Sequence, residues 1–209
     1  MSDASPRPET TTLRPGVYAG MLLLAVLFAL LPYTLADAAF GGDVGAMTNY
    51  PWNFSPLLAL CLYGGAFVRP RWLAVVLPVA AWVLQVGAVA LYTGDPAGLT
   101  SGVMPWVVVS VALCGAIGWG LRDRRDGWHL AGCGLAAGAL FFLVTNFGAW
   151  LGSPFYPQTP AGLLESYAAG LPFFRGTALG LLVFTPVLFA PSAARRPVTV
   201  VAAAPTHVA

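Results

Sequence analysis

The chain alternates between apolar runs and short polar connections. A helix needs about 20 mostly apolar residues to cross a hydrocarbon core of about 30 Å. The sequence offers six candidate runs, at about residues 17–35, 55–68, 72–92, 102–121, 128–151 and 172–190. The second run is short, and it reaches full length only if Trp52 and Phe54 extend it at the interface. The pattern predicts an all-α membrane protein, folded as a bundle of six transmembrane helices.

The two ends of the chain differ from the runs between them. Residues 1–16 form a polar stretch rich in proline and threonine. Residues 191–209 have low complexity, which is typical of a disordered tail. We therefore expect one transmembrane domain over residues 17–190, with a tail on either side.

The composition excludes several classes of protein. Apolar residues make up 58% of the chain and charged residues 9%, whereas a soluble domain carries about 25% charged residues. No polar stretch approaches the roughly 100 residues of a separate catalytic or nucleotide-binding domain. The phosphate-binding pattern G-x-x-x-x-G-K-[ST] is also absent from the sequence. Any work driven by ATP would need a partner chain.

The arginines predict the orientation in the membrane. With six crossings, nine of the ten arginines fall on one side, which the positive-inside rule makes cytoplasmic. These nine are Arg7, Arg14, Arg69, Arg71, Arg122, Arg124, Arg125, Arg195 and Arg196. The opposite loops are acidic apart from Arg175. We therefore expect both termini to be cytoplasmic, in the inner membrane of a bacterium.

An alternative makes the first apolar run a cleaved signal peptide. Residues 36–38 have the small-x-small pattern of a cleavage site. The run is nearly 20 residues long, however, whereas the apolar region of a signal peptide usually has 7–15 residues. Cleavage would leave five crossings and an outer N-terminus. The length favours a retained helix.

The sequence holds no recognisable catalytic or metal-binding motif. Cys61, Cys114 and Cys133 each lie inside an apolar run without C-x-x-C spacing, which favours packing over redox or metal chemistry. The two histidines, His129 and His207, belong to neither H-E-x-x-H nor any other zinc pattern. We expect no enzyme, no metal and no cofactor.

Polar and aromatic side chains gather in the outer loops. Trp52 and Asn53 end the first outer loop, just before Ser55, which can cap the second helix with Pro56 at its first position. One interpretation is a helix cap within an aromatic interfacial belt. The other is a pocket, because aromatic faces and amides suit a small polar ligand that contains a ring.

Two amides lie inside the predicted spans. Asn146 stands about five residues from the outer end of the fifth run, ~7–8 Å deep by helical rise. Gln85 lies in the outer half of the third run. An unpaired amide is expensive at such depth, so each needs a partner, either another helix or a ligand.

The last outer loop predicts a short helix on the outer face. Thr159 is suited to the N-cap, Pro160 to the first turn, and Gly170 to the position after the C-terminus. On this helix, Tyr167 can cover one face, while Glu165 points elsewhere. The loop also holds Tyr156.

Arg175 is unusual for its position. It occupies the first turn of the sixth run, where a cation opposes the positive end of the helix dipole and breaks the positive-inside pattern. Glu165, Asp43 or an anionic group of a ligand are the candidate partners. We predict one outer pocket, bordered by Trp52, Asn53, Asn146, Tyr156, Glu165, Tyr167 and Arg175.

Five sequence motifs carry a resemblance to a known family. They are Asn53-Phe54-Ser55-Pro56, Leu62-Tyr63-Gly64-Gly65-Ala66, Thr145-Asn146-Phe147-Gly148, Tyr156-Pro157-x-Thr159, and the segment 170–177. With these motifs, the chain resembles an uncharacterised family of bacterial integral-membrane proteins catalogued as transport proteins. That family is similar to the substrate-binding S components of energy-coupling-factor vitamin transporters, and more distantly to the MreD group of rod-shape proteins.

The resemblance implies a function. S components capture a vitamin-sized metabolite near the outer face, while partner chains hydrolyse ATP. They dock their transmembrane partner through small residues on the first helix, here Ala25 and Ala29. An MreD-like scaffold in the cell envelope is the alternative.

Overall fold

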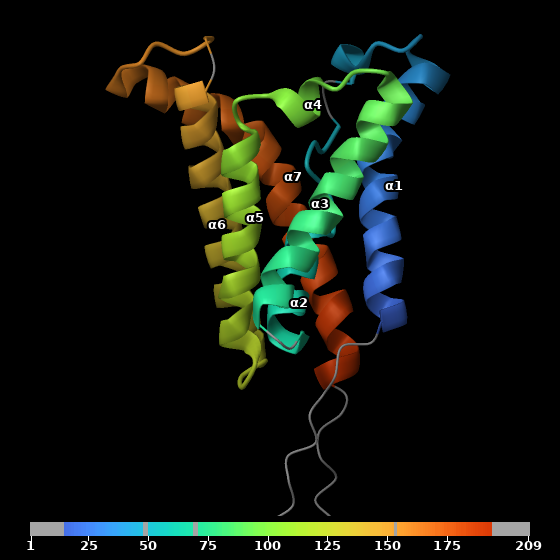
Figure 1. The fold of residues 1–209 in the computed structure, drawn as a ribbon, viewed down its shortest axis with the longest axis vertical. Helices are drawn as coiled ribbons and strands as arrows, with labels where there is room; N and C mark the ends of the chain where they lie inside the picture. Colours follow the sequence, from blue (N-terminus) through green and yellow to red (C-terminus); the bar gives the residue numbers. More distant parts are fainter. Residues whose placement is uncertain (1–14, 48–49, 69–70, 153, 194–209) are drawn as a thin grey trace, which may run out of the picture.

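Apolar helices make up most of the described chain (Figure 1). The computed structural model describes residues 15–47, 50–68, 71–152 and 154–193. The longer helices are α1 (Pro15–Ala39), α2 (Leu57–Phe67), α3 (Arg71–Thr93), α5 (Met104–Ile117), α6 (Gly127–Gly152) and α7 (Pro160–Ala193). Short helical turns are η1 (Val44–Ala46), α4 (Ala97–Thr100) and η2 (Gly118–Leu121). These ranges contain no strand, which confirms the all-α prediction for them.

Within the described ranges, five helical segments are long and apolar enough to cross a membrane. They are Ala19–Ala39, Arg71–Thr93, Met104–Leu121, Gly127–Gly152 and Pro160–Ala190. Each contains or closely matches one of the predicted runs. The predicted tails, 1–16 and 191–209, lie almost wholly outside the described residues.

The second predicted run differs from the others. Its helix, α2, has 11 residues, about 16 Å by helical rise, which is roughly half the hydrocarbon thickness. All of its residues are buried, and it contacts each of the five long helices. The helix begins only at Leu57 because Pro56 lacks an N–H group for a further helical hydrogen bond and disfavours helical backbone at Ser55 before it.

Residues 50–56 enter the bundle without helical structure. In Figure 1 they run from the upper end into the bundle behind α3, and α2 continues the path downward. The Ser55 hydroxyl accepts a hydrogen bond from the Leu57 backbone N–H at 3.2 Å. We call residues 50–56 the descending segment.

Glycines on α7 make room for the descending segment. A Cβ added at Gly176 would overlap the Trp52 carbonyl oxygen, and one added at Gly180 would lie 2.7 Å from the Ser55 carbonyl oxygen. The two glycines are one helical turn apart, so they form a groove without side chains. The backbone of the descending segment lies directly in that groove.

The expectation of a separate outer-face helix over residues 161–169 is wrong. Its predicted start is correct, because the Thr159 side chain accepts a hydrogen bond from the Gly162 N–H at 3.2 Å. The helix does not end at Gly170, however, and α7 continues for 34 residues. Gly170 is absent from the described glycines with positive φ. It packs against the Asn146 amide instead, where any Cβ would overlap.

The connections divide between two ends of the bundle. The α2–α3 and α5–α6 connections lie at the end where α1 begins and α7 finishes (Figure 1). We call this the arginine end, because it holds four of the five described arginines, Arg71, Arg122, Arg124 and Arg125; the fifth is Arg175 of α7. We call the opposite end the loop end. The chain passes there from α1 toward the descending segment, and from α6 to α7. The other five arginines of the predicted cytoplasmic set lie outside the described residues.

Candidate functional site

A cavity of about 330 Å³ opens in the loop-end half of the bundle. Its walls come from the second half of α1, the second half of α3 and residues 50–58, and Gly98 of α4, Phe141 of α6 and Thr177 of α7 complete them. We call it the main cavity because polar side chains line it, whereas a larger space of about 460 Å³ between α6 and α7 is lined by apolar residues apart from Thr185. Aromatic residues dominate its lining: Phe28, Tyr33, Tyr50, Trp52, Phe54, Trp82 and Phe141.

The polar groups of the main cavity carry no formal charge. Its polar side chains, besides the tyrosine and tryptophan rings, are Asn53, Ser55, Gln85 and Thr177. Among the described residues, none that lines the cavity is an arginine or a carboxylate.

Gln85 brings a buried polar atom without a partner to the wall of the main cavity. Its Oε1 is buried, with no hydrogen-bond partner among the described residues. Buried polar groups are nearly always paired, because an orphaned one costs ~1–3 kcal/mol. Such an exception, in the wall of a cavity, is the kind of group that a ligand can satisfy.

Asn53 holds an unusual backbone conformation. Its φ is 67°, and within the described ranges it is the only residue other than glycine with a positive φ. Asparagine tolerates this region better than most residues, but the conformation still has a cost. Asn53 also lines both the main cavity and a neighbouring cavity of about 180 Å³. Strain of this kind gathers at functional sites, which supports a role for the descending segment.

An aromatic cluster fixes the lower part of the descending segment. The Phe54 ring lies 5.2 Å from Phe28 of α1 and 5.3 Å from Phe184 of α7, centroid to centroid. Near the loop end, Tyr50 and Trp52 form an edge-to-face pair at 5.1 Å. Such aromatic pairs stabilise a geometry beyond the area that they bury. The aromatic wall of the cavity is therefore held from both α1 and α7.

Asn146 lies in the neighbouring cavity, where α6 meets α7. Its Nδ2 donates to the Phe142 carbonyl oxygen at 2.8 Å, and the Ser166 hydroxyl donates to its backbone oxygen at 2.8 Å. Asn146 thus contributes to packing between the helices and also borders an open space. Both interpretations drawn from the sequence remain compatible with this position.

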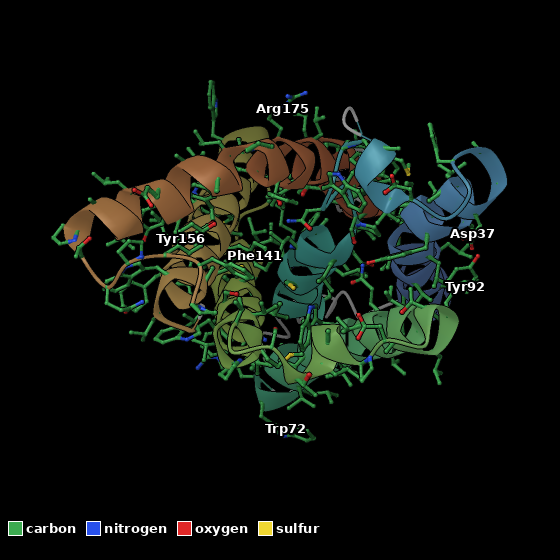
Figure 2. The ribbon with its side chains drawn as sticks, turned by 90° about the horizontal axis from the view of Figure 1, so that it is seen from above. Asp37, Trp72, Tyr92, Phe141, Tyr156 and Arg175 are labelled. Carbon is green, nitrogen blue, oxygen red and sulfur yellow. The ribbon has the colours of Figure 1, made fainter. Side chains whose placement is uncertain are left out.

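The remaining predicted site residues do not reach either of these cavities. The Tyr167 hydroxyl donates to the Leu143 carbonyl oxygen at 3.2 Å, so it ties α7 to α6. Tyr156 is half-buried in the α6–α7 connection, while Glu165 and Arg175 are exposed. In Figure 2, seen from above the loop end, Arg175 points away from the bundle on the far side of α7.

The expectation that all seven residues border one pocket is therefore not met. Because α7 is continuous, Glu165 and Arg175 stand ten residues apart on one helix, about 15 Å along its axis. No ion pair joins these two described side chains to each other. Asp43 instead accepts a hydrogen bond from the Gly45 N–H at 2.8 Å.

The small residues of the first helix also face inward. Ala25 is fully buried in the core of this chain, and Ala29 lines the main cavity. The outward face of α1 carries leucines such as Leu23 and Leu27, which are 61% and 53% exposed. The Ala25–Ala29 step is therefore used inside the bundle, so a partner helix would meet leucines on the described part of α1.

Sequence reasoning missed much of the cavity wall. Tyr33 and Trp82 lie within apolar runs, where nothing distinguishes a cavity-lining ring from a core or lipid-facing one. The isolated amide of Gln85 was a usable indication, since it is the only strongly polar side chain between residues 72 and 92. The amide indicated that Gln85 needs a partner, but it did not indicate which helices face Gln85 across the cavity.

Comparison with known proteins gives the family of the chain but no activity. No curated protein and no solved structure matches it. The likeness to S components is therefore not shown by these comparisons, whereas membership of an uncharacterised family is. The chain belongs to the family of unknown function DUF6580, whose model matches residues 9–202.

Proposed function

We propose that this protein captures a small metabolite at the loop end for uptake across the membrane. The observation that carries the proposal is the main cavity, where aromatic rings and the unpartnered amide oxygen of Gln85 line the same space. Its volume of about 330 Å³ falls in the range of small-molecule sites. The role is that of an S-component-like subunit without catalytic residues, for which partner chains supply ATP hydrolysis.

The proposal includes six crossings, with both termini in the cytoplasm of a bacterium. The descending segment and α2 together make the second crossing, protected from lipid by the surrounding helices. Burial is required there, because non-helical backbone at membrane depth is tolerated only inside protein or beside a water-filled cavity. Four of the five described arginines lie at one end, all except Arg175, and this supports the orientation.

Cysteine labelling should find Asp95 and Asp123 on opposite sides of the membrane. Both residues are exposed, Asp95 between α3 and α4 and Asp123 between η2 and α6. In intact cells, a membrane-impermeant maleimide should label Asp95→Cys and leave Asp123→Cys unlabelled until the cells are opened. Replacing Cys61, Cys114 and Cys133 beforehand removes background. Labelling of both positions from the same side would contradict six crossings.

A ligand screen on the purified protein tests the capture function. Saturable binding of a small metabolite, matched by slower uptake of that metabolite in cells lacking the chain, is the expected result. Trp82→Leu, which alters the cavity wall, should weaken both readouts, while Trp128→Leu is the matched control. Trp128 is 88% exposed and lies at the arginine end. Absence of any saturable ligand, together with co-purification of wall-synthesis proteins, would instead favour the scaffold role.

A further inference from the structure

The lining of the main cavity restricts the charge of its ligand. An ion moved from water into a protein cavity needs a charged or strongly hydrogen-bonding partner there. The described lining residues offer no such charge, and the outer arginine, Arg175, points away on the far side of α7 (Figure 2). An anionic or cationic ligand would lose part of its hydration without an opposite charge to compensate for it.

The polar groups of the lining restrict which hydrogen-bonding groups the ligand can present. Gln85 presents an amide, which holds a donor and an acceptor side by side, and its acceptor has no partner in the described chain. The Asn53 amide adds a second donor and acceptor, at the junction of the two cavities. The complement of an amide is another group with a donor next to an acceptor.

The aromatic residues in the lining of the main cavity restrict the shape of the ligand. Tyr50 and Trp52 on the descending segment and Trp82 on α3 present ring faces and edges to the same space. Flat rings stack favourably on such side chains. An aliphatic chain of the same size would gain burial but not this geometry.

We propose that the ligand of the main cavity is an uncharged molecule with a flat ring and an amide-type edge. This inference rests on the proposed capture function, and it names the chemical class of the captured molecule. Gln85 pairs with the amide-type edge, and the aromatic side chains hold the ring. Arg175 takes no part in binding.

A pair of probes with the same ring separates charge from shape. We choose 2-naphthamide, which is neutral and carries an amide, and 2-naphthoate, its carboxylate counterpart. Binding to the purified full-length chain in detergent is measured by equilibrium dialysis against protein-free micelles. The amide should bind at least about tenfold more tightly than the carboxylate, since the latter loses a donor and gains an unpaired charge.

Three variants test the assigned roles. Gln85→Met keeps the size of the side chain and removes the amide, so it should weaken 2-naphthamide binding about tenfold or more. Its melting temperature should equal or exceed that of the wild type, because the orphaned acceptor is gone. Asn53→Gly retains the backbone conformation, loses the side-chain amide, and should also weaken binding. Arg175→Ala should change the affinity less than twofold.

The outcomes test the ligand class separately from the proposed capture function. The proposed ligand class would be overturned if 2-naphthoate bound more tightly than 2-naphthamide, or if Gln85→Met left the binding of 2-naphthamide unchanged. Neither result would contradict the capture function. A lower melting temperature for Gln85→Met would also overturn the assignment, since a structural role predicts that loss. Failure of both probes to bind overturns the class, while the metabolite screen above decides separately whether any small molecule is captured.

Discussion

Replacing Arg122 by alanine should destabilise the protein by roughly 3 kcal/mol, since its guanidinium holds the end of α2. Its Nε donates to the Gly65 carbonyl oxygen at 2.9 Å, and its Nη2 donates to the Val68 carbonyl oxygen at 2.8 Å. Hydrogen bonds from a charged donor contribute about 1.5–3 kcal/mol each, and the carbonyls left behind are partly buried. Thermal melting of the purified protein in detergent measures the loss.

Arg124 provides the matched control for Arg122. It is exposed, two residues further along the same connection, and carries the same charge. Arg124→Ala should change the free energy of unfolding by less than about 0.5 kcal/mol. Arg122→Lys should recover only part of the stability, because lysine lacks the planar fork that reaches two carbonyls. Equal melting temperatures for Arg122→Ala and Arg124→Ala would contradict the anchoring role.

Gly176→Ala should destabilise the bundle and distort the main cavity in a single step. The added methyl group would overlap the Trp52 carbonyl oxygen, so either α7 or the descending segment must move. Overpacking of this kind typically costs about 1–3 kcal/mol. Because the displaced backbone carries Trp52 and Asn53, ligand binding should weaken along with the melting temperature.

Gly132→Ala is the control for the glycine substitution. Gly132 is an exposed residue within α6, and a Cβ there would meet nothing within 4 Å. Alanine favours a helix by up to about 1 kcal/mol over glycine. This variant should therefore be as stable as the wild type or more stable, with unchanged binding. A stable Gly176→Ala protein with normal ligand affinity would argue against direct backbone packing in the groove.

The long helices could be predicted because a single property defines them. A run such as 128–151 is apolar over most of its length, and α6 begins and ends within one residue of it. The helix in the second run was predicted less accurately, because packing within the bundle sets the length of α2. Pro56 delays the start of α2, and the burial of all its residues lets a helix shorter than the membrane occupy the centre of the bundle.

The break after residue 169 was mispredicted because two local preferences agreed on it. Gly170 is typical of the position after a helix, and Pro172 is typical of a new start. Tertiary packing overrides both. Gly170 serves as the contact point for Asn146, and α7 gains more from continuing along α6 than from a turn.

The site was only partly predictable for a related reason. Trp52 and Asn53 stood out because polar and aromatic residues adjoined a helix start, and both line the main cavity. Arg175 stood out by its charge, but a charge at the outer interface can face water or lipid headgroups as well as a pocket. The groove of Gly176 and Gly180 decides which face of α7 turns inward, because the backbone of the descending segment packs into it. The sequence of α7 alone does not show this packing.

The groove also explains why the main cavity lies between distant parts of the chain. Without side chains at Gly176 and Gly180, α7 receives the backbone of residues 51–55 directly. This close approach carries Trp52 and Asn53 into the bundle, opposite Gln85 of α3. Near the loop end, the Tyr92 hydroxyl donates to Asp37 Oδ2 at 2.5 Å and joins the ends of α3 and α1. The cavity wall is thus held by contacts outside the cavity.

Mass spectrometry of small molecules that co-purify with the full-length protein tests the central claim most directly. The protein is extracted in mild detergent, washed and denatured, and the released molecules are compared with those from Gln85→Met. The account predicts an uncharged, ring-containing compound that is enriched with the wild type and depleted with the variant. An anionic compound retained equally by both proteins, or a wild-type protein that releases nothing and binds nothing in the metabolite screen, would contradict it.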